Sequence, residues 1–425
     1  MKINDLKIFQ KDWWTKWKIL SVVGFIAVFI PLSIVHGSKQ RVWTDFHIFW
    51  TAGKSFFNGL PLYDPPEGGQ FLYPPFAAFL FQAFAPFPLK IAAGLFYFFN
   101  ALLYVTAVYL TKVIIEHLYP GNDSIKKPLI FAVILSAQFY FMNMNAGQVN
   151  LVVFVLCLAG IYLYLKGKGA FAGVFFVIPA FIKVTPAFLI VWILLRNGKK
   201  VILPVIISAV LCLILPVMLR GIEPGIQDMA DYYHKIVRPF KGGKVDTSFQ
   251  NQNVAGTIYR MTRPSTNTQN YNYRYIPLSE ETAAAVYKSS VLLIFALFTA
   301  NLIFLRIKHA GISALEISSV FLTGHLLSAL TWKAHLVTLL FVFTAFFAID
   351  RKTFAIQYKA VLYFLFCMIL FIGSTGKDIV GAKLHFYIGG FSITAWTLLL
   401  LFLFSIRFSA GLPLPEKNRE LKAHN

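Results

Sequence analysis

Long apolar runs recur along this chain from about residue 18 to residue 407, and they restrict its possible folds more than any other feature. Inside a bilayer only helices and closed barrels satisfy their backbone, and one helical crossing needs about 20 mostly apolar residues. The runs are continuous, whereas barrel strands are short and alternating, so a barrel is excluded. With 57% hydrophobic and 13% charged residues, one soluble core is also excluded. The sequence therefore predicts an all-α polytopic membrane protein.

The runs predict about twelve transmembrane helices, and the charges between them predict an orientation. The first run follows a start rich in Lys and Trp and lacks a small-residue cleavage site, so we expect an uncleaved span. Every second connection is basic, which by the positive-inside rule places both termini in the cytoplasm of a multi-pass cell-membrane (inner or plasma membrane) protein. The expected spans are 19–36, 91–117, 128–143, 149–165, 170–182, 186–195, 201–219, 284–305, 312–331, 335–349, 357–373 and 385–406.

Charge and cysteine content remove several other functions. The net charge of +21 would suit nucleic-acid binding, but the Lys and Arg residues lie at the ends of apolar runs, as in the basic connection Arg351–Lys352. No nucleic-acid partner is therefore predicted. The three cysteines lie singly within apolar runs and have no metal-site spacing, so neither a metal site nor a disulfide framework is expected. No cofactor is predicted either.

The segment 170–195 contains a break. Two runs, each too short to cross a bilayer, flank Lys183-Val184-Thr185-Pro186. We expect a broken hairpin near Lys183, although one continuous helix is the alternative. An ionisable group at membrane depth is costly and indicates function, and a lysine ammonium suits a phosphate. A snorkelling lysine is the other interpretation of Lys183.

The whole chain is predicted to form a single integral membrane domain (1–425) whose external segments, about 37–90 and 220–283, cover the outer face. Asp45 lies in the first segment within the aromatic stretch TDFHIFWTAG. Such surroundings desolvate a carboxylate, raise its pKa and suit it to general-base catalysis. The alternative is a helix N-cap, with Thr44 or Asp45 opening a helix that runs through Phe57.

Further polar and aromatic residues form a candidate binding set. The amide cluster in MNMNAGQVN is larger than a helix–helix turn needs and suits a polyhydroxylated ligand, whereas Lys333 and His335 at a span end would neutralise a phosphate. Each also has a structural alternative as a turn, rigid-loop or interface residue. The candidate substrate-binding residues are Tyr73, Asn145, Gln148, Asn150, Asn251, Asn253 and Trp332.

Taken in chain order, these pieces resemble glycosyltransferase family 87, across about residues 45–335. The motifs are Asp45-Phe46, Gly59-x-x-Leu-Tyr-Asp64, Tyr73-Pro-Pro, Gly147-Gln-x-Asn150, Lys183-x-x-Pro186, an Asn/Gln cluster at 250–253, and Ser328-x-x-x-Trp-x-x-His335. The resemblance implies a GT-C fold with an extracytoplasmic active site and a polyprenyl-phosphate-linked sugar donor. It also implies that Asp45 is the catalytic aspartate and that His335 matches a late family histidine.

The resulting hypothesis is an inverting hexosyltransferase. Asp45 would act as the base, and Lys183, His335 and Lys333 would bind the donor phosphate. The sugar would be mannose, with arabinose as an alternative, and the acceptor a glycan or glycolipid. The other partners would be membrane lipids. Two rivals stay open: a transporter or flippase of a lipid-linked saccharide, and a non-catalytic envelope scaffold.

Overall fold

The computed structural model describes residues 3–39, 44–64, 69–119, 125–196, 198–241, 245–263, 274–309, 311–349 and 356–409. These residues form helices and connecting loops, with no strand among them. The predicted basic connection Arg351–Lys352 and the tail after residue 409 lie outside the described residues, as do parts of both segments predicted to be external. The all-α prediction is confirmed.

Ten of the twelve predicted spans each correspond to one helix of the described chain, and the other two each correspond to two consecutive helices. The helices of the spans are α1 (Ile3–Ser38), α4 (Leu89–Leu118), α5 (Lys126–Ala146), α6 (Asn150–Leu165), α7 (Gly169–Ile182), α8 (Ala187–Leu195), α9 (Lys199–Arg220), α13 (Glu280–Ile307), α14 (Ala314–Leu327), η3 and α15 (Lys333–Thr338, Leu339–Ala348), α16 (Ile356–Ser374), and α18 and α19 (Ala382–Gly390, Ile393–Phe408).

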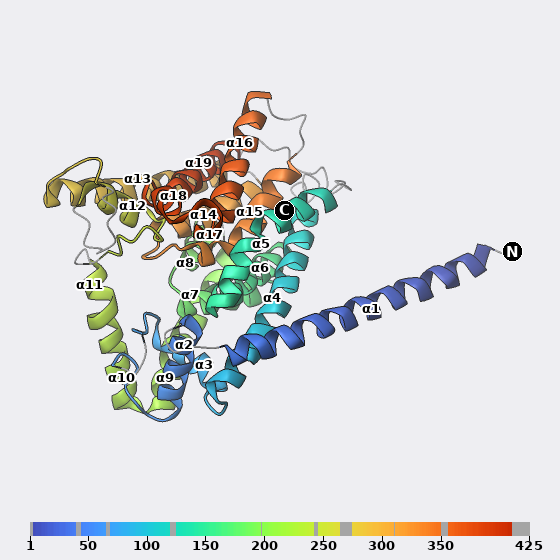
Figure 1. The fold of residues 1–425 in the computed structure, drawn as a ribbon, viewed down its shortest axis with the longest axis horizontal. Coiled ribbons are helices and arrows are strands. Elements are labelled where there is room, and N and C mark those ends of the chain that lie inside the picture. Colours follow the sequence, from blue (N-terminus) through green and yellow to red (C-terminus); the bar gives the residue numbers. More distant parts are fainter. Residues whose placement is uncertain are drawn as a thin grey trace.

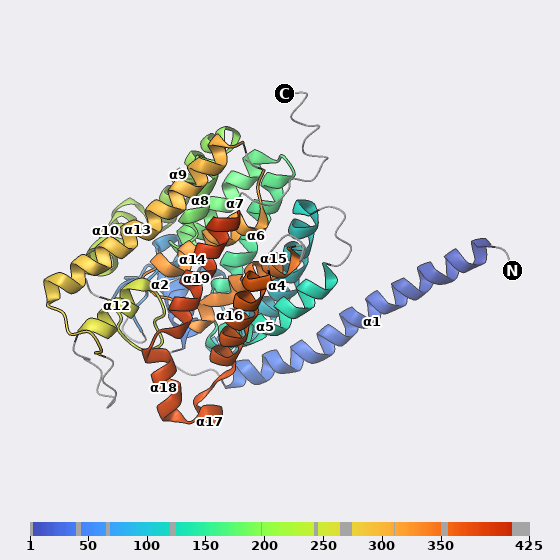
Figure 2. The same ribbon diagram turned by 90° about the horizontal axis from the view of Figure 1, so that it is seen from above.

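Six of these segments are long and apolar enough to cross a membrane, and several shorter apolar helices accompany them. The protein is therefore a polytopic membrane protein, and the count of twelve crossings stays a prediction. The N-terminal part of α1 projects away from the bundle in both views (Figures 1 and 2). Its other part packs against α4. Only 11% of the apolar window in α1 is buried within the protein, as expected for a helix that faces lipid.

The two segments predicted to be external contain short helices and loops, and their side of the membrane stays a prediction. The first holds α2 (Asp45–Phe57), α3 (Pro75–Phe81) and η1 (Gln82–Phe84), and the second holds α10 (Ile222–Asp231), η2 (Tyr232–Val237), α11 (Arg238–Lys241) and α12 (Val254–Thr262). The two segments are joined through Arg220. Its guanidinium pairs with Asp228 at 2.9 Å and donates to the carbonyls of Ser55, Phe56 and Leu60 at the end of α2. This contact holds α2 against α9 and α10.

Two helix breaks among the described residues differ in that the sequence predicted only one of them. The predicted break after α7 is confirmed, because Lys183 is extended and α8 begins only at Ala187. The run 385–406, predicted as one helix, is instead broken between α18 and α19, where Ser392 has a φ of +55°. There Arg260 of α12 donates to the Gly390 carbonyl at 3.2 Å and to the Ser392 hydroxyl. These bonds stabilise polar groups that the break exposes.

Candidate active site

Asp45 is the first residue of α2, and its neighbour is the helix cap. The Thr44 backbone is extended and its hydroxyl accepts a hydrogen bond from the His47 amide at 3.3 Å. The capping role therefore belongs to Thr44, and the Asp45 carboxylate is available for another role. A carboxylate in the first turn is also favoured by the helix dipole. The predicted end of this helix at Phe57 is confirmed.

The turn between α5 and α6 packs against the start of α2. Gly147 ends α5 with a φ of +67°, and a Cβ at this position would lie 2.4 Å from the Cβ of Phe46. A glycine is therefore needed for the left-handed backbone and for the close approach. This contact brings Gln148, the next residue, beside Asp45.

Gln148 is held in one orientation near that carboxylate. Its side-chain oxygen accepts from the Val149 amide at 3.3 Å and from the Tyr73 hydroxyl at 3.4 Å. Its amide group is thereby left to donate to Asp45, and this interaction lowers the pKa of the carboxyl. Burial has the larger, opposite effect and raises the pKa of Asp45 above its ordinary value. Asp45 is thus a half-buried carboxylate whose proton affinity is enhanced.

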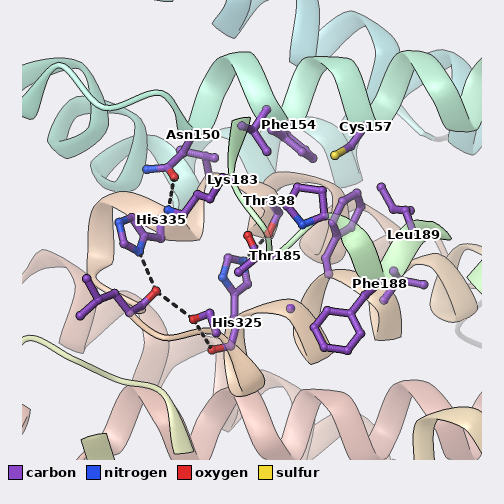
Figure 3. Close-up of a pocket in the computed structure, with 18 residues that line it drawn as sticks. Asn150, Phe154, Cys157, Lys183, Thr185, Phe188, Leu189, His325, His335 and Thr338 are labelled. Atoms are coloured by element: carbon purple, nitrogen blue, oxygen red, sulfur yellow. Dashed lines mark hydrogen bonds between the residues drawn. The ribbon is translucent and has the colours of Figure 1, made fainter. Parts of the chain in front are cut away.

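Lys183 interacts electrostatically with Asp45. Burial lowers the pKa of Lys183 to about 7, and the Asp45 carboxylate opposes this shift. The Lys183 ammonium donates to the Asn150 side-chain oxygen at 2.7 Å. The helix break thus places a basic group where it interacts with the candidate base. Figure 3 shows the hydrogen bond between Lys183 and Asn150.

A pocket extends from Lys183 between α6, α8 and α14 (Figure 3). Its polar lining groups are mainly Asn150, Lys183, His325 and His335, whereas the side chains from α6, α8 and α14 are mainly apolar. Those apolar residues are Val153, Phe154, Cys157, Phe188, Leu189, Val320 and Phe321. Such a pocket suits a ligand with an anionic head and a hydrocarbon tail.

His335 is oriented by the loop that precedes η3. Its Nδ1 lies 3.1 Å from the Leu330 carbonyl and 3.2 Å from the Trp332 amide nitrogen. The Trp332 ring is parallel to the imidazole, with centroids 6.3 Å apart, and its indole nitrogen donates to Asp246 at 3.4 Å. Both Nδ1 contacts are to backbone, so the orientation of the ring is fixed from that side.

The structure brings only part of the predicted set together. Asp45, Tyr73, Gln148, Asn150 and Lys183 are linked as described, and His335 shares the pocket with Asn150 and Lys183. Asn145 is exposed on α5, and Lys333 is half-buried and does not line the pocket.

Asn251 and Asn253 are fully buried and tie two loops together. Asn251 accepts from the Thr331 amide at 3.0 Å, whereas Asn253 caps α12 and donates to the carbonyls of Ser328 and Ala329. Their amides are thus used within the protein, and a substrate-binding role for them stays a prediction.

Two residues that the sequence reasoning did not select belong to this region. His325 of α14 lines the pocket and its Nε2 lies 2.6 Å from the Thr338 hydroxyl. Asn100 of α4 bonds to Asn143 at 3.3 Å behind the site. Both are polar residues within apolar helices, a signal that by itself indicates function in a membrane.

Comparison with known proteins decides the family. The model for glycosyltransferase family 87 matches residues 71–329, more than half of the sequence. The chain belongs to glycosyltransferase family 87. The resemblance inferred from the motifs is therefore confirmed, and with it the prediction of an enzyme of the glycosyltransferase class. The family 87 match includes Gln148, Lys183 and His325, whereas Asp45 lies before its first residue and His335 after its last.

One similar curated protein is a polyprenol-phosphate-mannose-dependent α-(1-2)-phosphatidylinositol mannoside mannosyltransferase of Mycolicibacterium smegmatis. It is 24% identical over 271 residues, which cover 58% of this family 87 chain and 58% of that relative. The alignment thus spans less than two thirds of the relative's length.

Proposed function

We propose that this protein transfers mannose from a polyprenyl-phosphate donor to a glycan or glycolipid acceptor, with inversion and with Asp45 as the general base. The observation that carries this proposal is the position of Lys183. Its ammonium interacts with Asp45 and lines a pocket that is otherwise largely apolar. The family and the name of the mycobacterial relative support the donor class.

The pocket suits the donor because a polyprenyl phosphate combines an anion with a hydrocarbon chain. The phosphate would contact Lys183 and His335, and the first isoprene units would pack against Phe154, Phe188 and Phe321. The remaining isoprenoid chain would stay in the bilayer. The sugar would then lie toward Asp45, where the acceptor enters.

In the proposed reaction, Asp45 takes the proton of an acceptor hydroxyl. The acceptor oxygen attacks the anomeric carbon and forms the new glycosidic bond, while the bond from that carbon to the phosphate oxygen breaks. The polyprenyl phosphate leaves with the bonding electrons, and one direct displacement inverts the anomeric configuration. Lys183 and His335 would stabilise the negative charge that grows on the phosphate. Lys333 does not line the pocket, so no contact with the phosphate is assigned to it.

The proposed setting is a GT-C architecture of about twelve crossings in a single membrane domain. Both termini would be cytoplasmic, and the pocket would open at the extracytoplasmic face of the cell membrane. Surrounding lipids would cover the apolar outer surface, which includes exposed residues of α9 and α13.

The test is transfer by purified protein from polyprenyl-phosphate mannose in detergent. Loss of a general base typically costs about 10²–10⁴-fold in rate, so Asp45→Asn is expected to lose most transfer. The loss is measured at a pH well below 7, where Lys183 stays charged without the Asp45 carboxylate and still binds the donor phosphate. Asp64→Asn is the matched control, because that carboxylate is exposed and pairs with Lys235. Near wild-type turnover by Asp45→Asn would refute the assignment.

The same assay separates transfer from transport. Sugar transfer in detergent needs no sealed compartment, whereas transport does. If the wild-type protein transferred no sugar but moved a labelled lipid-linked saccharide across proteoliposomes, the transporter alternative would replace the enzyme.

A further inference from the structure

Three buried asparagines from three helices form a line that ends at Lys183. They are Asn100 of α4, Asn143 of α5 and Asn150 of α6, which we call the asparagine relay. Asn100 and Asn143 have no exposed surface and Asn150 is 5% exposed. Burying a carboxamide is costly unless it is hydrogen-bonded. Three of them in one line therefore require a structural or functional reason.

The hydrogen bonds give the relay a direction. The Asn100 amide group donates to the Phe96 carbonyl of its own helix at 2.9 Å, so the Asn100 oxygen faces away and accepts from Asn143 at 3.3 Å. The Asn143 amide group also donates to the Gln148 carbonyl at 3.2 Å. The Asn143 oxygen is therefore turned toward Asn150.

Asn150 is oriented in the same way. Its amide group donates to the Asn143 oxygen and to the Ala334 carbonyl, both at 3.1 Å. Its oxygen is thus aimed at Lys183, whose ammonium donates to it at 2.7 Å. A reversed Asn150 would place an amide group against the ammonium and its oxygen against two acceptors. The network excludes that orientation.

The Ala334 contact connects the relay to a second candidate phosphate-binding residue. Ala334 directly precedes His335, so Asn150 bonds both to Lys183 and to the backbone beside His335. The Asn150 side chain therefore helps to fix the positions of both Lys183 and His335, which line the pocket.

We propose that Asn100 and Asn143 are positioning residues, which act through Asn150 to hold the Lys183 ammonium at the donor phosphate. The inference rests on the proposed function, because it assigns the phosphate of the donor to Lys183. Neither Asn100 nor Asn143 lines the pocket, so both act at a distance from the ligand. Packing alone would be served as well by an apolar residue of similar size.

A pH effect distinguishes this role from simple packing. Burial lowers the pKa of Lys183 to about 7, and Asp45 of α2 opposes that shift, while His325 of α14 and His335 of η3 also interact with Lys183. A correctly oriented Asn150 oxygen favours the charged lysine. Loss of that orientation lowers the pKa of Lys183 further, so phosphate binding fails at a lower pH. This loss of phosphate binding with rising pH is the basic limb of the binding curve. Asp45 and the two histidines gain protons on the acidic side, so they do not produce it.

The experiment measures binding of polyprenyl phosphate to the full-length protein in detergent across a pH series. Asn143→Leu removes the oxygen that orients Asn150, and we expect about 10-fold weaker binding near neutral pH, with the basic limb displaced to lower pH. Asn100→Ala is expected to change the affinity and the pH of the basic limb in the same direction but less, because the Gln148 carbonyl still holds Asn143. Ser136→Ala is the matched control: it is buried on α5 but bonds only within that helix, and should leave both unchanged.

Two results would overturn the relay. One is wild-type affinity in Asn143→Leu, and the other is an equal loss of affinity at every pH with no displaced limb, which indicates a merely structural role. If Asn143→Leu does not fold, Asn100→Ala decides by the same criteria.

A wild-type protein that binds no polyprenyl phosphate at any pH would overturn the proposed donor instead. The asparagine relay is then tested without a ligand, by measuring the pH dependence of Lys183 acylation with peptide mass spectrometry. Half-maximal acylation at a lower pH in the variants than in the wild type supports it, and an identical profile refutes it.

Discussion

Replacement of Gly147 by alanine tests whether the α5–α6 turn positions the candidate base. Gly147 has a φ of +67°, and an L residue in this left-handed region costs about 1–2 kcal/mol. The new Cβ would also lie 2.4 Å from the Phe46 Cβ and 3.3 Å from the Phe46 Cα and backbone nitrogen. Overpacking of this kind costs about 1–3 kcal/mol. The expected total destabilisation is about 2–5 kcal/mol.

Relief of the contact requires the start of α2 to move away from the turn, because backbone atoms of Phe46 are involved. Asp45 would then separate from Gln148 and Lys183. We therefore expect Gly147→Ala to lower kcat for sugar transfer as well as the unfolding temperature in detergent. Gly167→Ala is the matched control. Gly167 has a φ of +74° but open space around its Cβ position, so it bears only the backbone cost.

The difference between the two variants isolates the contact with Phe46. If both variants lose the same stability and Gly147→Ala keeps the wild-type kcat, the contact between Gly147 and Phe46 does not position Asp45. A large loss of stability with unchanged kcat would likewise show that Phe46 packing does not set the position of Asp45.

Two further predictions concern charge. The pH profile of kcat/KM should be bell-shaped. Because burial raises the pKa of Asp45, activity should fall at a higher pH on the acidic side than it would for an ordinary aspartate. Activity should fall again as the pH rises through the pKa of Lys183 at about 7, and a flat profile across this range would contradict both roles. Glu316 pairs with Arg196 at 2.7 Å and accepts a hydrogen bond from Trp192 in a buried site. Glu316→Gln should therefore destabilise the protein by about 3–5 kcal/mol. A double apolar replacement of Glu316 and Arg196 should restore much of the unfolding temperature.

The helical elements follow from the local sequence. Continuous apolar runs require helices in a bilayer because each backbone group must be satisfied within its own segment. The start and end of α2 follow from Thr44 as a cap and from the amphipathic stretch through Phe57. The break at Lys183 follows from a lysine and a proline between two apolar runs. These features depend on residues that are near one another in sequence.

The contacts that build the site were decided only by tertiary structure. Asn100 lies within an apolar run, and its bond to Asn143 depends on how α4 packs against α5. His325 likewise faces the pocket only because of how α14 packs, whereas Asn251 and Asn253, which are equally polar, are directed into loop contacts. The physical reason is that lipid and protein interior are both apolar, so hydrophobic periodicity does not identify the inward face of a membrane helix. Residue types mark where function is possible, and helix packing determines which of them meet.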